Sequence, residues 1–285
     1  ALIARLDEVG AQAPALQTLL PEEEAGIARA SSPIPAEETP GGFLKAARSL
    51  PAGADWTGGI TFTPSCGTTD IWSCVYGQDK QNIDDKADPV RFDPFLIYAG
   101  TRCSGAPDVA DLQQLTEIKL ARGTSRSLAR ELHSSNALVG NPDLVTTAID
   151  LTPGSGPVAL KNAIAGLLSA SGDCGGGALT IHAPLVALPA LMDLGLVSFD
   201  GDKYSVGGHL LIVDDYPNEP PTGGAAADAD EAWLYVTGPV EFQLGERIDV
   251  AHFTGHTNES IVLAERLAIV RFDPCCVFAI LADIC

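Results

Sequence analysis

Two histidines four residues apart are the pair whose spacing best suits metal chemistry. His252 and His256 have the separation that places two ligands on one face of a helix. The segment that holds them, HFTGHTN, contains a glycine and two threonines and is a poor helix, and no third ligand lies nearby in the sequence. His133, His182 and His209 stand singly and are interpreted as structural histidines. We therefore expect no metal site.

The short motifs of common enzyme classes are not found in the sequence. There is no G-x-S-x-G elbow, no Walker A loop and no G-x-G-x-x-G after a strand. Glycine runs at 154–156 and 175–177 have no lysine for a phosphate and are interpreted as linkers. The acids at 79–88 lack the alternation and the glycine of a calcium-binding loop. We expect no catalytic activity and no cofactor; a soluble α/β enzyme of unknown substrate remains the alternative from another class.

The seven cysteines raise the question of disulfide chemistry. No C-x-x-C pair is present, which argues against zinc and thioredoxin-type sites. Cys66 and Cys74 fall in the two arms of an expected hairpin, where a bridge would contribute roughly 2.5 kcal/mol. Cys103 follows one apolar strand and Cys275 or Cys276 begins another, so a bond or close contact is expected if those strands are neighbours. The alternative is that the thiols stay reduced and act as small hydrophobes.

Charge and hydropathy limit the class of protein. Lys and Arg number 17 against 37 Asp and Glu, a net charge of −20, and this disfavours a direct nucleic-acid binder. A hydrophobic content of 46% over 285 residues suffices for a core in one large or two small domains. The most apolar stretch, 178–197, contains His182, two prolines and Asp193, which a membrane-spanning helix tolerates badly. We expect a chain made in the cytoplasm, with at least an initiator methionine removed.

The longest predicted helix covers about residues 109–133 and carries two stripes. An apolar seam recurs at three- and four-residue steps and should face the core; it consists of Leu112, Leu115, Ile118, Leu128 and Leu132. A basic line on the same helix consists of Lys119, Arg122, Arg126 and Arg130. Three interpretations of this line stay open: ion pairs with a neighbouring subunit, a surface toward nucleic acid, and a solvated helix face.

The other segments predict a mixed α and β protein. Residues 157–171 form a helix, 178–183 a strand, 184–197 a helix ended by Gly195, and 197–206 a hairpin that turns at Asp200-Gly201. The strands at 209–213 and 233–244 are expected to complete one sheet. Before these, 1–20 has an amphipathic pattern, 21–42 is acidic and proline-rich, and 56–89 reads as a hairpin with a charged tail.

A ten-residue pattern occurs twice. VRFDPFLIYA at 90–99 and VRFDPCCVFA at 270–279 each place an Arg-Phe-Asp-Pro step before a short apolar run. This pattern is typical of a buried strand that is entered through a proline. We predict that the two copies open strands of one sheet, which the chain begins early and closes at its end.

Several segments, taken in order, resemble the major capsid proteins of tailed bacteriophages of actinobacteria. They are DPFLIYAGTRCS, ALTIHAPLVALPALMDLGLV, FDGDKYSVGGHLLIV, DDYPNEPPTG, WLYVTGPV and LAERLAIVRFDPCCVFAI. The resemblance covers about residues 56–285 and depends on this common order, since none of the motifs is a catalytic signature. It implies the α+β Hong Kong 97-type capsid fold, with an N-terminal arm, an E-loop, a P-domain and an A-domain.

On this resemblance, each part of the chain receives a role. The implied segments are the N-terminal arm at 1–55, the E-loop at 56–89, the P-domain at 90–150 with its spine helix, the A-domain at 151–250, and the P-domain return strands at 251–285. The implied function is a structural virion protein that assembles in the host cytoplasm, as hexamers and pentamers, into an icosahedral head. That head would enclose double-stranded DNA without sequence-specific binding. Implied partners are the protein itself and portal, scaffold and decoration proteins; an encapsulin-like compartment shell is the alternative.

Residues 1–88 are expected to work between subunits. A two-stranded hairpin is marginal in water and cannot bury its own apolar side chains, which here are Ile60, Phe62, Ile71, Trp72 and Tyr76. We expect them to lie over the 109–133 helix of a neighbour. There the basic line would meet Asp79, Asp84, Asp85 and Asp88. Such ion pairs contribute about 0–1 kcal/mol each, so affinity should come from the apolar residues.

Overall fold

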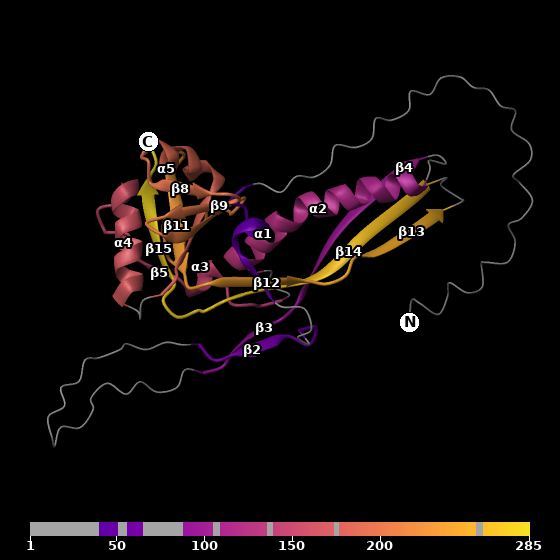
Figure 1. Ribbon diagram of the computed structural model, residues 1–285, viewed down its shortest axis with the longest axis horizontal. Helices are drawn as coiled ribbons and strands as arrows, with labels where there is room; N and C mark the ends of the chain where they lie inside the picture. Colours follow the sequence, from indigo (N-terminus) through magenta and orange to yellow (C-terminus); the bar gives the residue numbers. More distant parts are fainter. Residues whose placement is uncertain are drawn as a thin grey trace, which may run out of the picture. The chain divides into compact units, whose positions relative to one another are not determined.

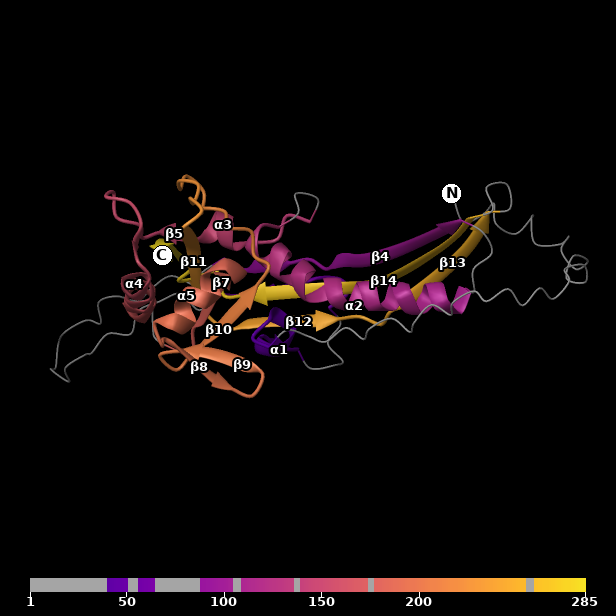
Figure 2. The same cartoon turned by 90° about the horizontal axis from the view of Figure 1, so that it is seen from above.

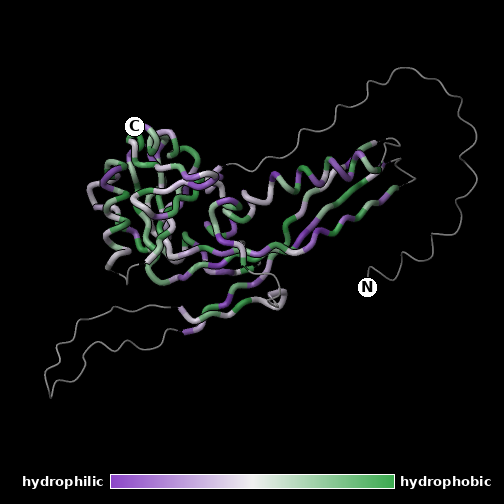
Figure 3. Tube along the Cα trace, viewed as in Figure 1, coloured by the Kyte–Doolittle hydropathy of each residue, from purple (hydrophilic) through white to green (hydrophobic). Residues whose placement is uncertain are grey.

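The computed structural model describes residues 40–50, 56–64, 88–104, 109–135, 139–173, 177–254 and 259–285. Two mixed sheets and one long helix, α2 (Val109–His133), dominate this part of the chain (Figure 1). Shorter helices are α1 (Phe43–Ala46), α3 (Leu144–Thr147), α4 (Leu160–Asp173) and α5 (Leu188–Asp193), with a 3-10 turn, η2 (Leu185–Ala187). Hydrophobic stretches occur in both sheets (Figure 3).

A five-stranded sheet is built around the 14-residue strand β14 (Glu259–Phe272). Strand β4 (Phe95–Ser104) pairs antiparallel with β14 from Phe95–Ala268 to Ser104–Glu259. Strands β13 (Ile248–Thr254) and β12 (Val240–Leu244) pair antiparallel with successive parts of β14. The short β1 (Arg48–Ser49) adds to β12 in parallel.

Helix α2 runs along one face of this sheet (Figure 2). Its bounds agree with the prediction of 109–133. The predicted apolar seam is confirmed at Leu112, Leu128 and Leu132, which are buried, and wrong at Leu115, which is exposed. Thr116 and Thr124 are buried instead, because their hydroxyls donate to the Leu112 and Leu120 carbonyls at 2.7 Å and so need no water.

An eight-stranded sheet forms the other half of the described chain. Its main path runs β5 (Ile149–Asp150), β15 (Phe278–Asp283), β11 (Glu231–Thr237), β7 (Thr180–Pro184), β10 (His209–Asp214), β9 (Lys203–Val206) and β8 (Val197–Asp200), and β6 (Val158–Ala159) pairs with β15. The predicted hairpin is β8–β9, and Gly201 has the positive φ of 59° that its tight turn requires.

Strand β11 shows why this sheet has a core on each of its faces. Ala232, Leu234 and Val236 face a cluster that includes Leu160 and Leu167 of α4. Trp233 and Tyr235, the alternate residues, face a cluster that includes Leu128 and Leu132 of α2 together with Phe242 and Phe272. The second cluster is continuous across both sheets, so α2 joins them through packed side chains.

The repeated Arg-Phe-Asp-Pro pattern does not open strands of one sheet, and that prediction is wrong. The first copy leads from β3 (Val90–Phe92), which pairs with β2 (Ile60–Phe62), into β4 of the five-stranded sheet. The second copy ends β14, and the chain then turns through Cys276, with φ 65°, into β15 of the eight-stranded sheet. The two copies nevertheless meet, since the Phe92 and Phe272 rings lie edge to face at 5.7 Å.

Sheet membership also corrects two expected groupings. Strand β12 belongs to the five-stranded sheet and not with β11, although only Gly238 and Pro239 separate them. Strand β15 belongs to the eight-stranded sheet, so the last strand of the chain does not return to the sheet that contains β4. The predicted boundary between the segments 151–250 and 251–285 therefore does not coincide with the boundary between the two sheets.

Candidate subunit interface

The five-stranded sheet has one face covered by α2 and one face that is not. Directly opposed residues of antiparallel strands lie on the same side of a sheet. Ile97, Thr101, Val262 and Ala264 are buried on the side of α2. Thr101 is held there by a 2.8 Å hydrogen bond with Thr116 and a 3.0 Å hydrogen bond from Lys119.

The opposite side of the same strands, which we call the open face, is accessible and mainly apolar, and it also carries Glu265, His252 and the Arg102–Glu259 ion pair. Its rows pair Leu96 with Leu267, Glu265 with both Tyr98 and Ile248, and Leu263 with both Gly100 and Val250. Tyr98 is 70% exposed, Ile248 58% and Leu96 50%. The hydrophobic members are Leu96, Tyr98, Ile248, Val250, Ile261, Leu263 and Leu267. Contiguous exposed hydrophobic residues of this kind mark an interaction surface.

A groove lies along the free edge of β4, between this edge and α2. Among the described strands, β4 pairs with β14 alone, so the other edge of β4 carries unpaired backbone groups. A groove of about 620 Å³ lies along residues 95–98 of this strand, and its other wall includes Arg130 and Glu131 of α2. An extended segment of another chain would find both hydrogen-bonding groups and apolar side chains at this edge.

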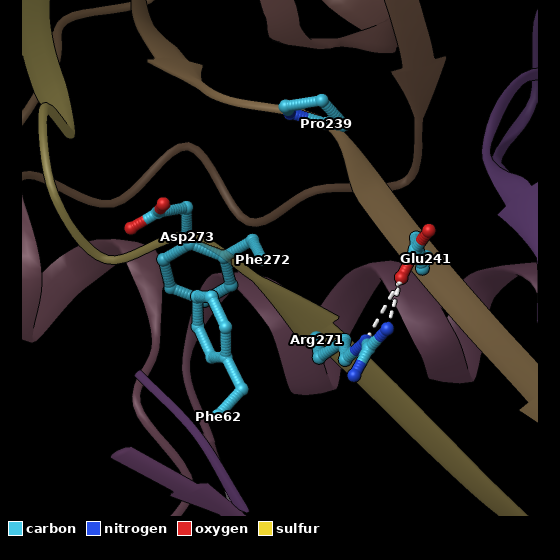
Figure 4. Close-up of a pocket in the computed structure, with 6 residues that line it drawn as sticks. All are labelled: Phe62, Pro239, Glu241, Arg271, Phe272 and Asp273. Carbon is cyan, nitrogen blue, oxygen red and sulfur yellow. Dashed lines mark hydrogen bonds and ion pairs between the residues drawn. The ribbon is translucent and has the colours of Figure 1, made fainter. Parts of the chain in front are cut away.

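A smaller pocket of about 210 Å³ lies where the β2–β3 ribbon meets the end of β14 (Figure 4). Phe62, Phe272 and Pro239 supply its apolar lining. Arg271 closes one side and donates from Nε to the Glu241 carboxylate at 2.9 Å. The pocket has an apolar floor and a paired charge at its edge, a composition that suits a side chain of a protein partner.

The basic line of α2 is engaged within the subunit. Arg126 and Arg130 both pair with Asp215, the latter at 3.3 Å, and this attaches α2 to the end of β10. Lys119 bonds Thr101, and Arg122 also has a partner within the chain. These contacts account for much of the line without a neighbour.

A second basic contact secures α2 at β13. Arg247 pairs with Glu117 of α2 and with Asp249 at 3.0 Å, and the hydrogen bond with Glu117 raises the pKa of Arg247. These pairs attach the start of β13 to α2 on the covered side of the sheet.

The structure describes only part of the predicted contact set. Ile60 and Phe62 lie in β2, where they are half-buried and pack against the main core, and Asp88 is exposed. The remaining members lie outside the described residues: Ile71, Trp72, Tyr76, Asp79, Asp84 and Asp85. The open face was not predicted, because the sequence at 95–99 is a continuous apolar run and gives no alternation that marks Leu96 and Tyr98 as exposed.

Only some of the cysteine predictions concern described residues. Cys66 and Cys74 lie outside the described residues. The expected contact between Cys103 and Cys275 is wrong: Cys103 is a free thiol opposite Ser260, whereas Cys275 follows the other end of β14. Both Cys275 and Cys276 are disulfide-bonded.

The metal candidates gain no support from the described residues. His252 is exposed on β13, and His256 lies outside the described part of the chain. No group of three or more potential ligands that could hold a metal ion occurs among the described side chains. None of the described helices is both long enough and apolar enough to cross a membrane.

Comparison with solved structures identifies chains that have a similar fold. The capsid of an empty GTA particle superposes with a TM-score of 0.55 at 11% identity, over 89% of this chain and 94% of that chain. The capsid of a native GTA particle gives 0.55 at 10% identity, over 99% of both chains. A structure from Mycobacterium phage Ogopogo gives 0.52 at 13% identity, over 87% of this chain and 95% of that chain.

No family model matches the sequence, and no curated protein matches it either. The chain therefore has the mixed α+β fold of phage capsid structures, and the resemblance seen in the sequence is confirmed at the level of the fold.

Proposed function

We propose that this chain is the major capsid protein of a tailed bacteriophage. In this role it assembles as hexamers and pentamers into an icosahedral head that encloses double-stranded DNA. The observation that carries the proposal is the agreement of the fold with capsid chains over nearly the whole length of both. The open face gives a second reason, since an isolated subunit leaves it in water at a cost of about 25 cal/mol per Å² of apolar surface.

The named parts of the Hong Kong 97-type fold follow the sheets in this proposal. Helix α2 is the spine helix, and with the five-stranded sheet it forms the P-domain. The eight-stranded sheet with α4 and α5 forms the A-domain. The β2–β3 ribbon is the base of the E-loop, and the residues before 56 form the N-terminal arm. In this proposal residues 240–272 belong to the P-domain and residues 278–283 belong to the A-domain, an assignment that the sheet order supports.

The open face of one subunit is covered, in this account, by residues 65–87 of a second copy. That segment leaves the β2–β3 ribbon after Pro64 and returns at Asp88, so it can reach roughly 35 Å from the ribbon and back. It carries Ile71, Trp72 and Tyr76, whose apolar area suits the open face better than α2, where Arg126 and Arg130 already bind Asp215. Ion pairs from Asp79, Asp84, Asp85 and Asp88 to α2 would be a minor addition.

The negative net charge of the chain is consistent with a protein shell that encloses DNA. A net charge of −20 repels phosphate, so a shell of such subunits encloses DNA without adhering to it. Assembly in the host cytoplasm, and portal, scaffold and decoration proteins as partners, belong to the same proposal.

Sedimentation velocity of the purified full chain tests the proposal. A capsid protein sediments as capsomers or shells, and an α/β enzyme sediments as a monomer or small oligomer. The nucleic-acid content of native particles then separates a phage head, which holds DNA, from an encapsulin-like compartment, which holds protein cargo. A folded chain that stays monomeric or dimeric at every concentration would refute the capsid role.

A further inference from the structure

Four rings are buried together where the C-terminal end of α2 meets the eight-stranded sheet. We call them the histidine cluster: His133, His182, Tyr216 and Tyr235. His133, the last residue of α2, is 1% exposed and lies 5.2 Å from the Tyr235 ring and 6.1 Å from the Tyr216 ring. Neither of its ring nitrogens has a hydrogen-bond partner among the described residues. A buried, unpaired polar group is costly, so a neutral imidazole is tolerated here and a charged one is not.

His182 on β7 is equally buried, but its hydrogen bonds are complete. Thr237 Oγ1 donates to the Gly238 carbonyl at 2.7 Å, so it accepts from His182 Nε2 at 3.0 Å. His182 Nδ1 is then the acceptor for the Tyr216 hydroxyl at 3.0 Å. A second proton on His182 would make Nδ1 a donor, so the Tyr216 hydroxyl would lose its acceptor and would have to turn its own hydrogen away from the ring. Neutral His182 therefore fits the network, and the doubly protonated form breaks it.

Several of the elements around the histidine cluster carry charged groups near it. Asp143 precedes α3, and Asp214, Asp215 and Glu219 lie on and after β10. Arg126, Arg130 and Glu131 lie on the last turns of α2, and Asp150 lies on β5. None of these carboxylates accepts a hydrogen bond from either histidine: the ring nitrogens of His133 have no partner in the described part of the chain, and the partners of His182 are Tyr216 and Thr237.

We propose that the histidine cluster is an acid-sensitive latch that holds α2 against the eight-stranded sheet while both imidazoles are neutral and releases it when they are protonated. Because Leu128 and Leu132 pack with Trp233 and Tyr235 in one core, release at this point separates the two sheets of the subunit. The latch is a property of the single subunit and does not depend on whether the chain builds a shell.

The direction of the effect follows from the burial. Desolvation lowers the pKa of His133 from 6.5 to about 4, opposed by Asp143, and lowers that of His182 to about 3. The open state carries ordinary histidines, which bind protons from about pH 6.5 downward. Its extra protons make opening more favourable as the pH falls from 6.5 toward 4. Each histidine raises the opening constant about tenfold per pH unit in this window, and both together raise it about a hundredfold.

Hydrogen exchange of the full chain, read in peptides that cover 126–135 and 210–220, measures this opening. Between pH 6 and pH 5, after correction for intrinsic exchange, the logarithm of the opening constant should rise by about two per pH unit. The slope should fall to about one in His133→Leu and in His182→Gln, and to about zero in the double variant. A variant that folds less well changes the intercept and leaves the slope, so poor folding does not hide the result.

Two control variants separate this latch from other acid effects. His252→Gln changes an exposed histidine on β13 and should keep the slope of two. Asp215→Asn removes the carboxylate that pairs with Arg126 and Arg130, and should raise opening at every pH without a change of slope. An unchanged slope in both His133→Leu and His182→Gln would overturn the proposal. So would protection in 126–135 that is the same at pH 6 and pH 5.

Discussion

Removal of the Tyr98 ring should block association between subunits and leave the subunit folded. Tyr98 is 70% exposed at the centre of the open face, between Leu96 and Gly100 on β4. An aromatic side chain buries about 150–250 Å² when covered, so about 100–175 Å² of Tyr98 remains for a partner to cover. At about 25 cal/mol per Å², the ring contributes about 3 kcal/mol per contact, which is roughly a hundredfold in the dissociation constant.

The assay compares assembly with folding in the same samples. Light scattering or sedimentation measures the assembly of Tyr98→Ala. Thermal unfolding measures the stability of its subunit, which should change by less than about 1 kcal/mol because the side chain is exposed. Tyr98→Phe keeps the apolar ring and is the matched control, expected to assemble like the original chain. Normal assembly of Tyr98→Ala at the same protein concentration would refute the assignment of the open face as an interface.

Three further predictions concern other parts of the subunit. Phe272→Ala should lower the free energy of unfolding by about 3–5 kcal/mol in a chemical denaturation, because it leaves a cavity beside Phe92 in the shared core; a loss below 1 kcal/mol would contradict this packing. Asp215→Asn should cost about 0–1 kcal/mol, and less at high salt, because both of its arginine pairs are exposed; a salt-independent loss would count against it. Trp72→Ala should prevent assembly without unfolding the subunit, whereas Asp84→Lys should weaken assembly mildly and mainly at low salt. A chain whose residues 65–87 are replaced by a glycine-serine linker tests the whole segment, and normal shells from it would exclude the proposed role of these residues.

Helix α2 could be predicted closely because its signals are local. Buried positions recur every four residues along α2, at Leu112, Thr116, Leu120, Thr124, Leu128 and Leu132. Such a helical period is visible in the sequence wherever the helix is placed. Leu115 was assigned wrongly because hydropathy ranks leucine above threonine. The structure prefers Thr116 and Thr124, whose hydroxyls bond to the carbonyls four residues earlier and which fit against β4 and β14.

Sheet membership could not be predicted, because it depends on contacts between distant parts of the chain. The two Arg-Phe-Asp-Pro copies look alike, yet Phe95 continues into a strand beside β14, whereas Cys275 and Cys276 turn the chain toward β11. The open face was missed for a related reason. The run at 95–99 reads as buried on both faces, and only the position of α2 decides that Ile97 is covered while Leu96 and Tyr98 are exposed.

The histidine cluster shows the same limit. His133 and His182 are 49 positions apart in the sequence, and each alone is an unremarkable residue; only the docking of α2 on the sheet brings them to the same tyrosine. Their interpretation as structural histidines agrees with their burial, but their lack of acceptors for a second proton was not visible from the sequence.

Electron microscopy of the purified full chain in negative stain shows whether the subunits build a shell. We expect closed shells of uniform diameter, or rings of five and six subunits where closure is incomplete. Folded, unassembled particles of one or two chains at every protein concentration tried would contradict the proposed capsid role.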